Sequence, residues 1–426
     1  MLDKELFKVI LLEGCPEKKL LPRYYKIPDI NKIITIIGPR RSGKTSMLYQ
    51  IIYDLKDISK DKIIYLNFED ERLSDFNITD FQKILDYYFE LYPQNKGEEI
   101  YFFFDEIQSV DGWQKFIRRI YDKERCKIFI TGSSAKLLSK EISTELRGRT
   151  YDIYVYPFSF IEYLEFKGIK VDNTTIYSSK RHVLVRELEN YLTNGGFPEV
   201  IAIDSQIRCE VLQNYFNVLI FRDIIERYNI KQIDIVKDLL LYLVNNNSRG
   251  FSVNSYYNYL KSQNRAISKD TLYLFSDYID NTMYFFFVPI YSNSKRKQNS
   301  NPKKCYVIDT GLSNCLLKRP GTNDGWNFEN LVFIELKRKN KEVYYFKGKS
   351  ECDFIAVTNN KVEAIQVCFD FNDSTKDREI NGLLEAMASL NIDKGTIITK
   401  DLSKEEKLGK NTIYYIPLYQ WLLSQK

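Results

Sequence analysis

The chain has 426 residues and a mass of 50.5 kDa, which exceeds one ordinary hydrophobic core and predicts about two to four domains. Its net charge of +5 permits an anionic partner without requiring one. No run of about 18 apolar residues occurs, and the start, MLDKELFKVI, lacks the apolar core of a signal peptide. These features predict a cytoplasmic protein with no membrane partner.

Cysteine and histidine usage limits the chemistry further. The seven cysteines contain no C-x-x-C pair, which argues against zinc sites and a disulfide framework and predicts reduced, mostly buried thiols. The single histidine, His182, lies in a polar-flanked helical segment and is expected to be a surface or packing residue. Ser-His-Asp and Cys-His hydrolases are therefore excluded, and catalysis must depend on carboxylates, lysines, arginines and backbone donors.

The first element with chemical content is IITIIGPRRSGKTSML, residues 33–48. An apolar run predicts a buried strand, the loop fits G-x-x-x-x-G-K-[ST], and apolar residues then recur at helical spacing. In such a loop the backbone N–H groups surround phosphates, the lysine reaches the terminal phosphates and the hydroxyl of Thr45 binds Mg²⁺. The predicted ATP-binding residues are Gly38, Pro39, Arg40, Arg41, Ser42, Gly43, Lys44, Thr45 and Ser46.

The next motif, IYFFFDEIQ at 100–108, is an apolar run that ends in two carboxylates. Asp105 is expected to hold Mg²⁺, and Glu106 is expected to polarise the attacking water. A glutamate after the aspartate favours hydrolysis over transfer to a second substrate.

Two further strands are predicted at 63–70 and 127–134. In a parallel sheet with its ligand at the carboxyl ends of the strands, Thr131, Ser133 or Ser134 would lie near the γ-phosphate, and Ser134 is a candidate catalytic residue. An equally weighted alternative is a loop that only needs small residues. Arg147 and Arg149 are candidates for stabilising transition-state charge, in cis or from a neighbouring subunit of an oligomer.

The middle of the chain reads first as helices, over 180–245. Residues 251–310 then read as helix, helix and hairpin, with Ser268 as an N-cap, an order that suits a winged helix. The hairpin connection is predicted to be a polar loop with a basic tip that can lie along a DNA backbone or can simply be solvated. Its basic residues are Lys295, Arg296, Lys297, Lys303 and Lys304.

The series GPRRSGKT, LNFED, FFFDEIQSVDGW, ITGSSAKLL, LRGR, YPFSFIEYL, GGFPEV, FRDIIERYNI, YVIDTGL, FENLVFIEL and ECDFIAV resembles a large prokaryotic family of AAA-type ATPases over nearly the whole chain. Together with the helical pattern of 180–245, the resemblance implies an α/β protein in four parts. These are an AAA-type P-loop ATPase domain of the additional-strand class at 1–165, a helical lid at 175–247, a winged helix at 248–310 and a restriction-endonuclease-like α/β domain at 311–426.

Such nuclease-like folds place an acid on a first helix, an aspartate on one strand and an acid-x-lysine on the next. Glu329 and Asp353 occupy the first two places, but Gln366-Val367-Cys368 stands at the third. Because glutamine is a weak metal ligand and cysteine does not replace the lysine ammonium, we expect a retained fold without nuclease activity.

Three functions stay open at this point. The leading one is an ATPase that acts as a nucleotide-driven switch and is associated with DNA or protein. The second is an ATP-assisted metal-dependent nuclease, and the third is a signalling scaffold that holds nucleotide as a structural ligand. A GTPase is disfavoured, because TKDL at 399–402 lacks the aspartate that would recognise guanine.

Overall fold

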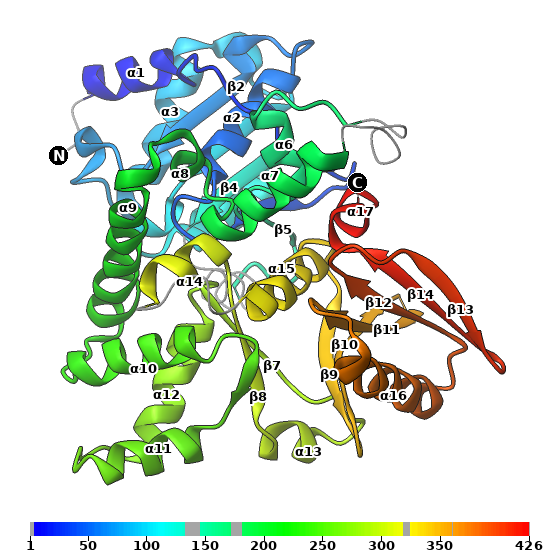
Figure 1. Cartoon of the computed structure of the whole chain (residues 1–426). Coiled ribbons are helices and arrows are strands. Elements are labelled where there is room, and N and C mark those ends of the chain that lie inside the picture. Colours follow the sequence, from blue (N-terminus) through cyan, green and yellow to red (C-terminus); the bar gives the residue numbers. More distant parts are fainter. Residues whose placement is uncertain (1–3, 133–144, 172–180, 318–323, 360, 426) are drawn as a thin grey trace. The chain divides into compact units, whose positions relative to one another are not determined.

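The computed structural model describes residues 4–132, 145–171, 181–317, 324–359 and 361–425 (Figure 1). The chain divides into two compact units, Met1–Tyr156 and Pro157–Lys426, here called the N-terminal and C-terminal units. Within the described ranges no helix combines the length and the hydropathy that crossing a bilayer requires.

The N-terminal unit contains a parallel sheet of five strands in the order β2-β3-β4-β1-β5. The strands are β1 (Ile33–Ile37), β2 (Ile63–Asn67), β3 (Ile100–Asp105), β4 (Cys126–Gly132) and β5 (Thr150–Tyr154). Strand β4 lies between β1, which leads into the phosphate loop, and β3, which ends in Asp105. The predicted parallel α/β sheet with an additional strand is therefore confirmed.

Helices cover both faces of this sheet because successive strand residues point to opposite sides. Phe102 and Phe104 of β3 enter one core with α1, α3 and α4, whereas Phe103 enters a second core with α2. The helices are α1 (Lys4–Glu13), α2 (Lys44–Asp54), α3 (Phe81–Leu91) and α4 (Trp113–Lys123). Single-turn 3-10 helices occur at Lys60–Lys62, Glu71–Leu73, Ile78–Asp80, Pro93–Asn95 and Ile107–Ser109.

The C-terminal unit contains a six-stranded mixed sheet in the order β13-β14-β12-β11-β10-β9. Strands β9, β10 and β11 are antiparallel neighbours, and β11, β12 and β14 are parallel. The elements are α15 (Asp324–Arg338), β9 (Glu342–Lys347), β10 (Glu351–Thr358), β11 (Lys361–Cys368), α16 (Asp373–Leu390), β12 (Lys394–Thr399), β13 (Lys404–Leu408), β14 (Asn411–Pro417) and α17 (Leu418–Leu423).

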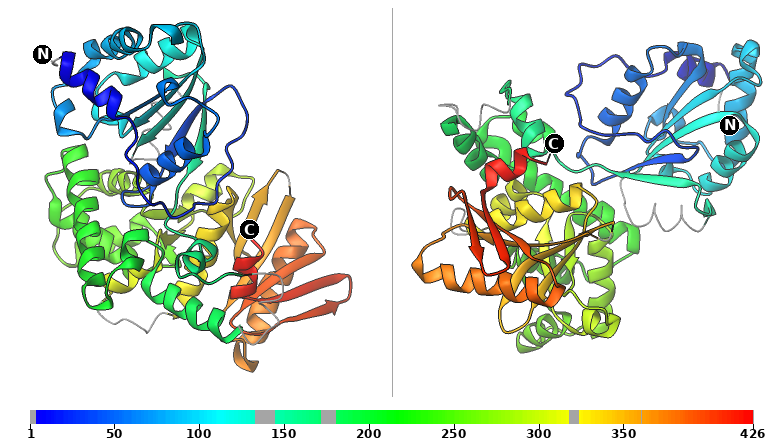
Figure 2. Two further views of the ribbon diagram at one scale, coloured as in Figure 1. Left: turned by 90° about the horizontal axis from the view of Figure 1, so that it is seen from above. Right: turned by 90° about the vertical axis from the view of Figure 1, so that its right-hand side faces the viewer.

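Two helices lie on opposite faces of the six-stranded sheet. Phe354 of β10 packs on Phe333 of α15, with ring centroids 6.4 Å apart. The next residue, Ile355, enters a core with Leu383 of α16, the long orange helix in Figure 2. The described chain order is thus helix, three antiparallel strands, helix and a parallel strand.

A second, three-stranded sheet of this unit has the antiparallel order β6-β8-β7. The predicted order of helix, helix and hairpin is confirmed, and the Ser268 hydroxyl accepts a hydrogen bond from the Thr271 N–H (3.0 Å), as an N-cap does. The connection expected as a polar loop contains a short helix, α13. The elements are α10 (Ile233–Asn245), β6 (Arg249–Phe251), α11 (Val253–Ser262), α12 (Lys269–Asp280), β7 (Phe285–Val288), α13 (Lys295–Ser300) and β8 (Lys303–Val307).

The other helices of the C-terminal unit, most of them in the range predicted as helical, bury apolar residues at helical spacing. Leu184 and Tyr191 are buried on one helix, Phe216 and Leu219 are buried further along the chain, and His182 is exposed. These elements are α6 (Phe160–Phe166), α7 (Arg181–Asn194), α8 (Pro198–Ala202), α9 (Ser205–Val218), a π-helical segment (Leu219–Glu226) and α14 (Thr310–Leu316).

The expectation of reduced thiols is wrong for two of the seven cysteines. Cys209 of α9 and Cys315 of α14 form a disulfide, and Cys15, Cys126, Cys305, Cys352 and Cys368 are free. The paired cysteines are 106 residues apart in sequence and become neighbours only because α9 packs against α14. No local pattern in the sequence marks this pair.

Two motifs that are distant in sequence, GGFPEV and YVIDTGL, meet in the C-terminal unit. The Asp309 carboxylate accepts hydrogen bonds from the backbone N–H groups of Gly196 (2.6 Å) and Leu312 (3.0 Å). A Cβ on Gly311 would lie 2.1 Å from the Asn194 carbonyl oxygen. The glycines are therefore needed because two backbone segments approach each other closely.

Because the two backbone segments are so close, a single methyl group added at Gly311 should destabilise the C-terminal unit. Gly311→Ala is expected to lower the free energy of unfolding of the C-terminal unit by about 1–3 kcal/mol or more, since the backbone must move to relieve the overlap. Gly325→Ala is the matched control, because this glycine lies in α15 and its Cβ would meet only Phe369 at 4.0 Å. Urea unfolding followed by circular dichroism measures both variants, and equal midpoints would contradict the prediction.

Candidate active site

The carboxyl ends of β1, β2, β3 and β4 meet at one edge of the parallel sheet. Asn67 of β2 is in register with Asp105 of β3, and the Phe68 N–H donates to the Asp105 carbonyl oxygen (3.0 Å). Ile36 of β1 is in register with Thr131 of β4. Because parallel strands present their carboxyl ends at a common edge, the phosphate loop, the acidic pair and Thr131 lie side by side.

The phosphate loop needs glycine at its first position. A Cβ on Gly38 would lie 2.3 Å from the Val155 carbonyl oxygen, so only glycine allows this approach of two backbones. The loop then passes through positive φ at Arg41 (66°) and Gly43 (98°) before α2 begins at Lys44. The Ser42 hydroxyl is buried and donates to the Pro39 carbonyl oxygen (2.9 Å), which closes the turn.

An arginine outside the predicted motifs also contacts the phosphate loop. The buried Arg23 guanidinium donates to the carbonyl oxygens of Ser42 (3.1 Å) and Tyr156 (2.7 Å). It therefore ties the segment before β1 to the loop and to the chain after β5. A lone arginine in LLPRYY gives no local signal, because its partners come from other parts of the chain.

Lys44 is buried, with 5% of its surface exposed. Its ammonium donates to the Pro39 carbonyl oxygen (3.3 Å) and lies 3.4 Å from a carboxylate oxygen of Glu106. The acidic residue next to Asp105 provides a counter-charge for the lysine, and a sequence pattern does not reveal that pairing. Lys44 and Glu106 therefore form one ion pair at the centre of the site.

Asp105 is buried at the end of β3 and receives several hydrogen bonds. The Thr131 hydroxyl donates to one carboxylate oxygen, and the Tyr65 hydroxyl donates to the other (3.3 Å). Burial raises the pKa of the Asp105 carboxyl, and hydrogen bonds from Thr131 and Thr45 oppose that rise. Thr45 of the loop and Asp105 of β3, the two predicted Mg²⁺ ligands, are thus in contact.

Glu106 has an unusual backbone conformation for a residue with a side chain, at φ 51°. Its N–H donates to the Thr131 hydroxyl (2.9 Å), and its carboxylate accepts from the Gln108 amide (2.5 Å) as well as facing Lys44. A left-handed conformation of this kind costs energy and is common at functional sites. Thr131 therefore fixes both Asp105 and Glu106.

The remaining loop residues lie at the rim of the site. Arg40 is 3.4 Å from a carboxylate oxygen of Glu69, the glutamate of the LNFED motif, and Ser46 is half-buried in the first turn of α2.

The residues around Thr45 and Asp105 fit Mg²⁺ by donor type, since hydroxyl and carboxylate oxygens are its usual protein ligands. Backbone N–H groups at the start of α2 fit phosphate.

Of the other three predicted catalytic residues, the structure describes only Arg147 and Arg149. Ser134, together with Ser133, lies outside the described residues. Arg149 forms an ion pair with Asp122 of α4 (3.0 Å), and its carbonyl oxygen accepts from the N–H of Ile33, the first residue of β1. Arg147 is exposed in the preceding turn. The length of β1, about 3.3 Å per residue, separates Arg149 and the turn that contains Arg147 from the phosphate loop, which favours the role in trans over the role in cis.

The residues of the suspected nuclease-like site come together in the C-terminal unit. Glu329 of α15, Asp353 of β10 and Gln366 of β11 form one buried polar cluster in which the Asp353 N–H donates to the Gln366 amide oxygen (3.1 Å). The same cluster contains Lys304 of β8, which is only 6% exposed.

The burial of Lys304 differs from the prediction that it belongs to an exposed, basic loop tip. Lys295, Arg296 and Lys297 are exposed on α13, as expected, and Lys303 is half-buried.

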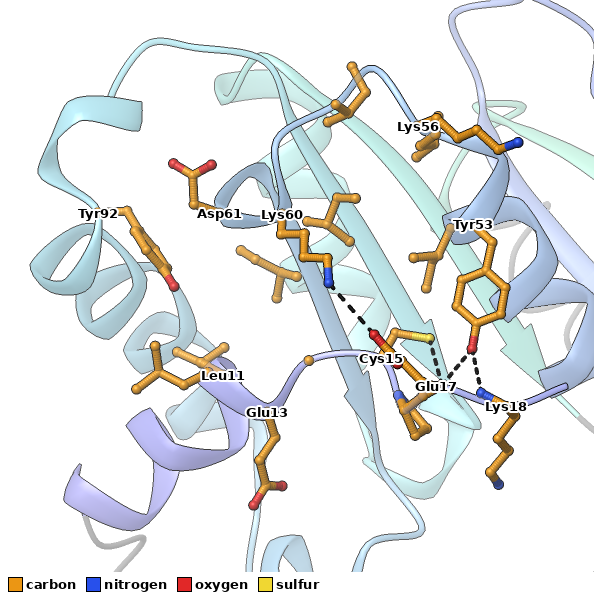
Figure 3. A pocket seen from close by; sticks show the side chains of 18 of the residues that line it. Leu11, Glu13, Cys15, Glu17, Lys18, Tyr53, Lys56, Lys60, Asp61 and Tyr92 are labelled. Carbon is orange, nitrogen blue, oxygen red and sulfur yellow. Dashed lines mark hydrogen bonds and ion pairs between the residues drawn. The ribbon is translucent and has the colours of Figure 1, made fainter.

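A separate cavity of about 900 Å³ occurs in the N-terminal unit (Figure 3). Its walls come from residues 11–19, the end of α2, the start of β2 and the end of α3, and include Cys15, Tyr53 and Tyr92. None of the phosphate-loop residues 38–46 lines this cavity. It is therefore distinct from the predicted nucleotide site.

The parallel sheet, the phosphate loop and the buried acidic pair together define the class of a P-loop ATPase of the AAA type. An AAA domain matches residues 30–164, and a domain of unknown function (DUF8612) matches residues 185–323. The chain belongs to a prokaryotic family of AAA-type P-loop ATPases with relatives in archaea and bacteria.

Two relatives match this chain over nearly their full length. The uncharacterized protein MJ1544 of Methanocaldococcus jannaschii is 37% identical, over 100% of this chain and 97% of that one. An uncharacterized protein of Haemophilus influenzae is 33% identical, over 95% of this chain and 97% of that one. Among solved structures, C. elegans PCH-2 matches 51% of this chain and 60% of that one at 16% identity, with a TM-score of 0.25.

Proposed function

We propose that the protein hydrolyses ATP with Mg²⁺ in the N-terminal unit and acts in the cytoplasm as a nucleotide-driven switch. The observation that carries this proposal is the Lys44–Glu106 ion pair beside Asp105, Thr45 and Thr131. A scaffold that only holds nucleotide needs the loop and its lysine but has no use for a glutamate in a strained conformation at this place.

The ion pair suggests how binding prepares the chemistry. When ATP enters, the Lys44 ammonium turns toward the phosphates, and the Glu106 carboxylate loses its counter-charge. Glu106 is then free to accept a hydrogen bond from the attacking water, while Thr131 keeps its backbone in place. Thr45 and Asp105 would hold Mg²⁺, which neutralises phosphate charge when bound. Arg147 or Arg149 of a neighbouring subunit would complete the site in an oligomer.

The first experiment is to measure the ATP hydrolysis rate of the purified chain with and without duplex DNA. Magnesium-dependent hydrolysis supports the ATPase, and stimulation by DNA supports a DNA-associated switch. Absence of hydrolysis with retained ATP binding would favour the scaffold instead.

Two features support a DNA-binding winged helix between α10 and β8. The element order α10, β6, α11, α12, β7, β8 and the sheet order β6-β8-β7 are those expected of this module. Helix α13 then presents Lys295, Arg296 and Lys297 to solvent from the hairpin. These cations are suited to phosphate contacts without base specificity.

A specific observation favours a protein partner for the same region. Helix α12 carries three aspartates and one lysine, which does not suit a DNA backbone. Tyr273 and Leu274 of this helix are each 50% exposed, as is common at protein interfaces. DNA and protein are therefore the two candidate partners.

Salt dependence separates these candidates. If α13 contacts phosphates, the variant Lys295→Gln/Arg296→Gln/Lys297→Gln should weaken DNA binding about equally for all sequences and reduce the salt slope by about 2–3 units, roughly one per lost cation. The matched control is Lys394→Gln/Lys407→Gln/Lys410→Gln, which removes the same charge from exposed positions of the C-terminal unit. Fluorescence anisotropy at several salt concentrations measures both. Equal loss in both variants, or no DNA binding, would favour a protein partner.

We propose that the part from α15 to α17 has a nuclease-like fold without nuclease activity. The order α15, β9, β10, β11, α16, β12 in a mixed sheet supports this fold, and Gln366 and Cys368 in place of acid and lysine argue against cleavage. Plasmid DNA incubated with the protein and Mg²⁺ or Mn²⁺ should stay intact, with or without ATP. Metal-dependent cleavage that is lost on Asp353→Ala would revive the nuclease.

A further inference from the structure

The buried cluster around Lys304 is independent of the proposed ATPase site and lies wholly in the C-terminal unit. The Lys304 ammonium is 2.9 Å from Asp353 Oδ1, 3.1 Å from Glu329 Oε1 and 2.9 Å from Glu351 Oε1. The three carboxylates come from α15 and β10, and the lysine comes from β8. The side chains of Lys304, Glu329 and Asp353 are 7%, 13% and 11% exposed, whereas that of Glu351 is 39% exposed. The ammonium thus lies between two largely buried carboxylates and one that reaches the surface.

These distances are those of charged N–H···O hydrogen bonds. A nuclease-like fold implies a divalent metal among such carboxylates, but Mg²⁺ needs oxygens at about 2.0–2.1 Å and Ca²⁺ at about 2.3–2.6 Å. The ammonium nitrogen of Lys304 occupies the space between the three carboxylates. A metal therefore has no room there unless the lysine leaves.

The other polar atoms of the cluster already have partners. The Tyr306 hydroxyl donates to Glu329 Oε1 (2.6 Å), and the Val367 N–H donates to Asp353 Oδ2 (3.0 Å). The Gln366 amide oxygen accepts from the Asp353 N–H, and its amide group donates to the buried Glu379. Both ends of the Gln366 amide are therefore held by protein partners. Among the described residues, no group of three Asp, Glu, His or Cys side chains is arranged to hold a metal ion.

Electrostatics keep this lysine charged. Burial by itself would lower the pKa of the ammonium, but the carboxylates of Asp353 and Glu329 together raise it well above its ordinary value. Burial raises the pKa of Glu329 to about 7, and Lys304 opposes that rise. Removing the ammonium would leave buried negative charge without a counter-ion, which is strongly unfavourable.

We infer that the Lys304 ammonium is the resident cation of the Glu329–Glu351–Asp353 cluster and takes the place that a divalent metal would need. The C-terminal unit then binds no divalent cation at this cluster. The same contacts anchor β8, and with it the hairpin that carries α13, to α15 and β10.

The inference is tested by measuring Mn²⁺ binding to the full-length, nucleotide-free protein at pH 8 by electron paramagnetic resonance. All variants carry Asp105→Ala, so that the phosphate-loop metal ligand is absent. The parent and Asp353→Asn should bind Mn²⁺ equally weakly. Lys304→Met should gain one Mn²⁺ site at least about tenfold tighter than the parent, and Lys304→Met/Asp353→Asn should lose it. Lys303→Met is the matched control, because it removes the same charge from the preceding, half-buried position and should gain no site.

Every other outcome of these measurements either supports or overturns the inference. Parent binding that is lost on Asp353→Asn would show that the cluster holds a metal despite Lys304. A folded Lys304→Met protein that gains no site would also overturn the inference. If Lys304→Met does not fold alone, recovery of its fold with Mn²⁺ supports the inference, and failure of Mn²⁺ to restore the fold contradicts it.

Discussion

Glu106→Gln is expected to slow ATP hydrolysis by about two to four orders of magnitude while ATP still binds. The amide keeps the shape of the side chain and its contact with Gln108, but it no longer attracts a proton from water. Because the substitution also removes the ion pair with Lys44, ATP affinity should be equal to or greater than that of the wild type. Single-turnover hydrolysis and equilibrium binding of a fluorescent ATP analogue measure the two effects separately.

Substitutions of two other carboxylates, Asp105 and Glu71, provide the controls for this result. Asp105→Ala should weaken nucleotide binding only when Mg²⁺ is present, because it removes a predicted metal ligand. Glu71→Gln changes an exposed carboxylate of the same unit and should leave both measurements unchanged. A wild-type hydrolysis rate in a folded Glu106→Gln protein would assign the catalytic role to another residue.

Lys44→Ala is expected to weaken ATP binding by about 10- to 150-fold and to remove measurable turnover. The estimate follows from the loss of charged hydrogen bonds to phosphate, each worth about 1.5–3 kcal/mol. Lys44 is buried against Glu106, so this variant should also lose some stability through the unpaired carboxylate. Isothermal titration with ATP and thermal unfolding separate affinity from folding.

Two further variants make this test specific. Lys56→Ala removes an exposed lysine just beyond α2 and should bind ATP as the wild type does. Lys44→Ala/Glu106→Gln removes the unpaired charge and should recover stability without recovering turnover. Undiminished ATP affinity and turnover in folded Lys44→Ala protein would contradict the assignment of the phosphate loop.

The arrangement of the phosphate loop and the acidic pair was largely predictable because the signals for both are local. The apolar run 33–37, the glycines of the loop and Lys44-Thr45 follow one another directly, and the run that ends in Asp105-Glu106 has the same form. Alternation along β3 sends Phe102 and Phe104 to one face and Phe103 to the other, which is the pattern of a strand buried on both sides. The class of fold and the order of the motifs therefore follow from neighbouring residues.

The partners of these residues were not predictable, because they come from other parts of the chain. The arginine behind the phosphate loop, Arg23, is at the loop only because the segment before β1 folds back on it. Thr131, one of three residues expected near the γ-phosphate, also holds Asp105 and Glu106, and those two contacts follow only from the packing of β4 beside β3. Arg149 lies at the far end of β1, a position that depends on how β5 joins the sheet.

The sequence by itself determined the strand and helix types, the phosphate loop and the acidic pair, since these depend on hydrophobic periodicity and on adjacent residues. The tertiary structure alone decided the Cys209–Cys315 disulfide, the contact of Asp309 with Gly196 and the burial of Lys304. In sequence Lys304 belongs to a basic, polar stretch that predicts exposure. It is buried because α15 and β10, which follow it in the chain, supply the carboxylates that pair with its charge.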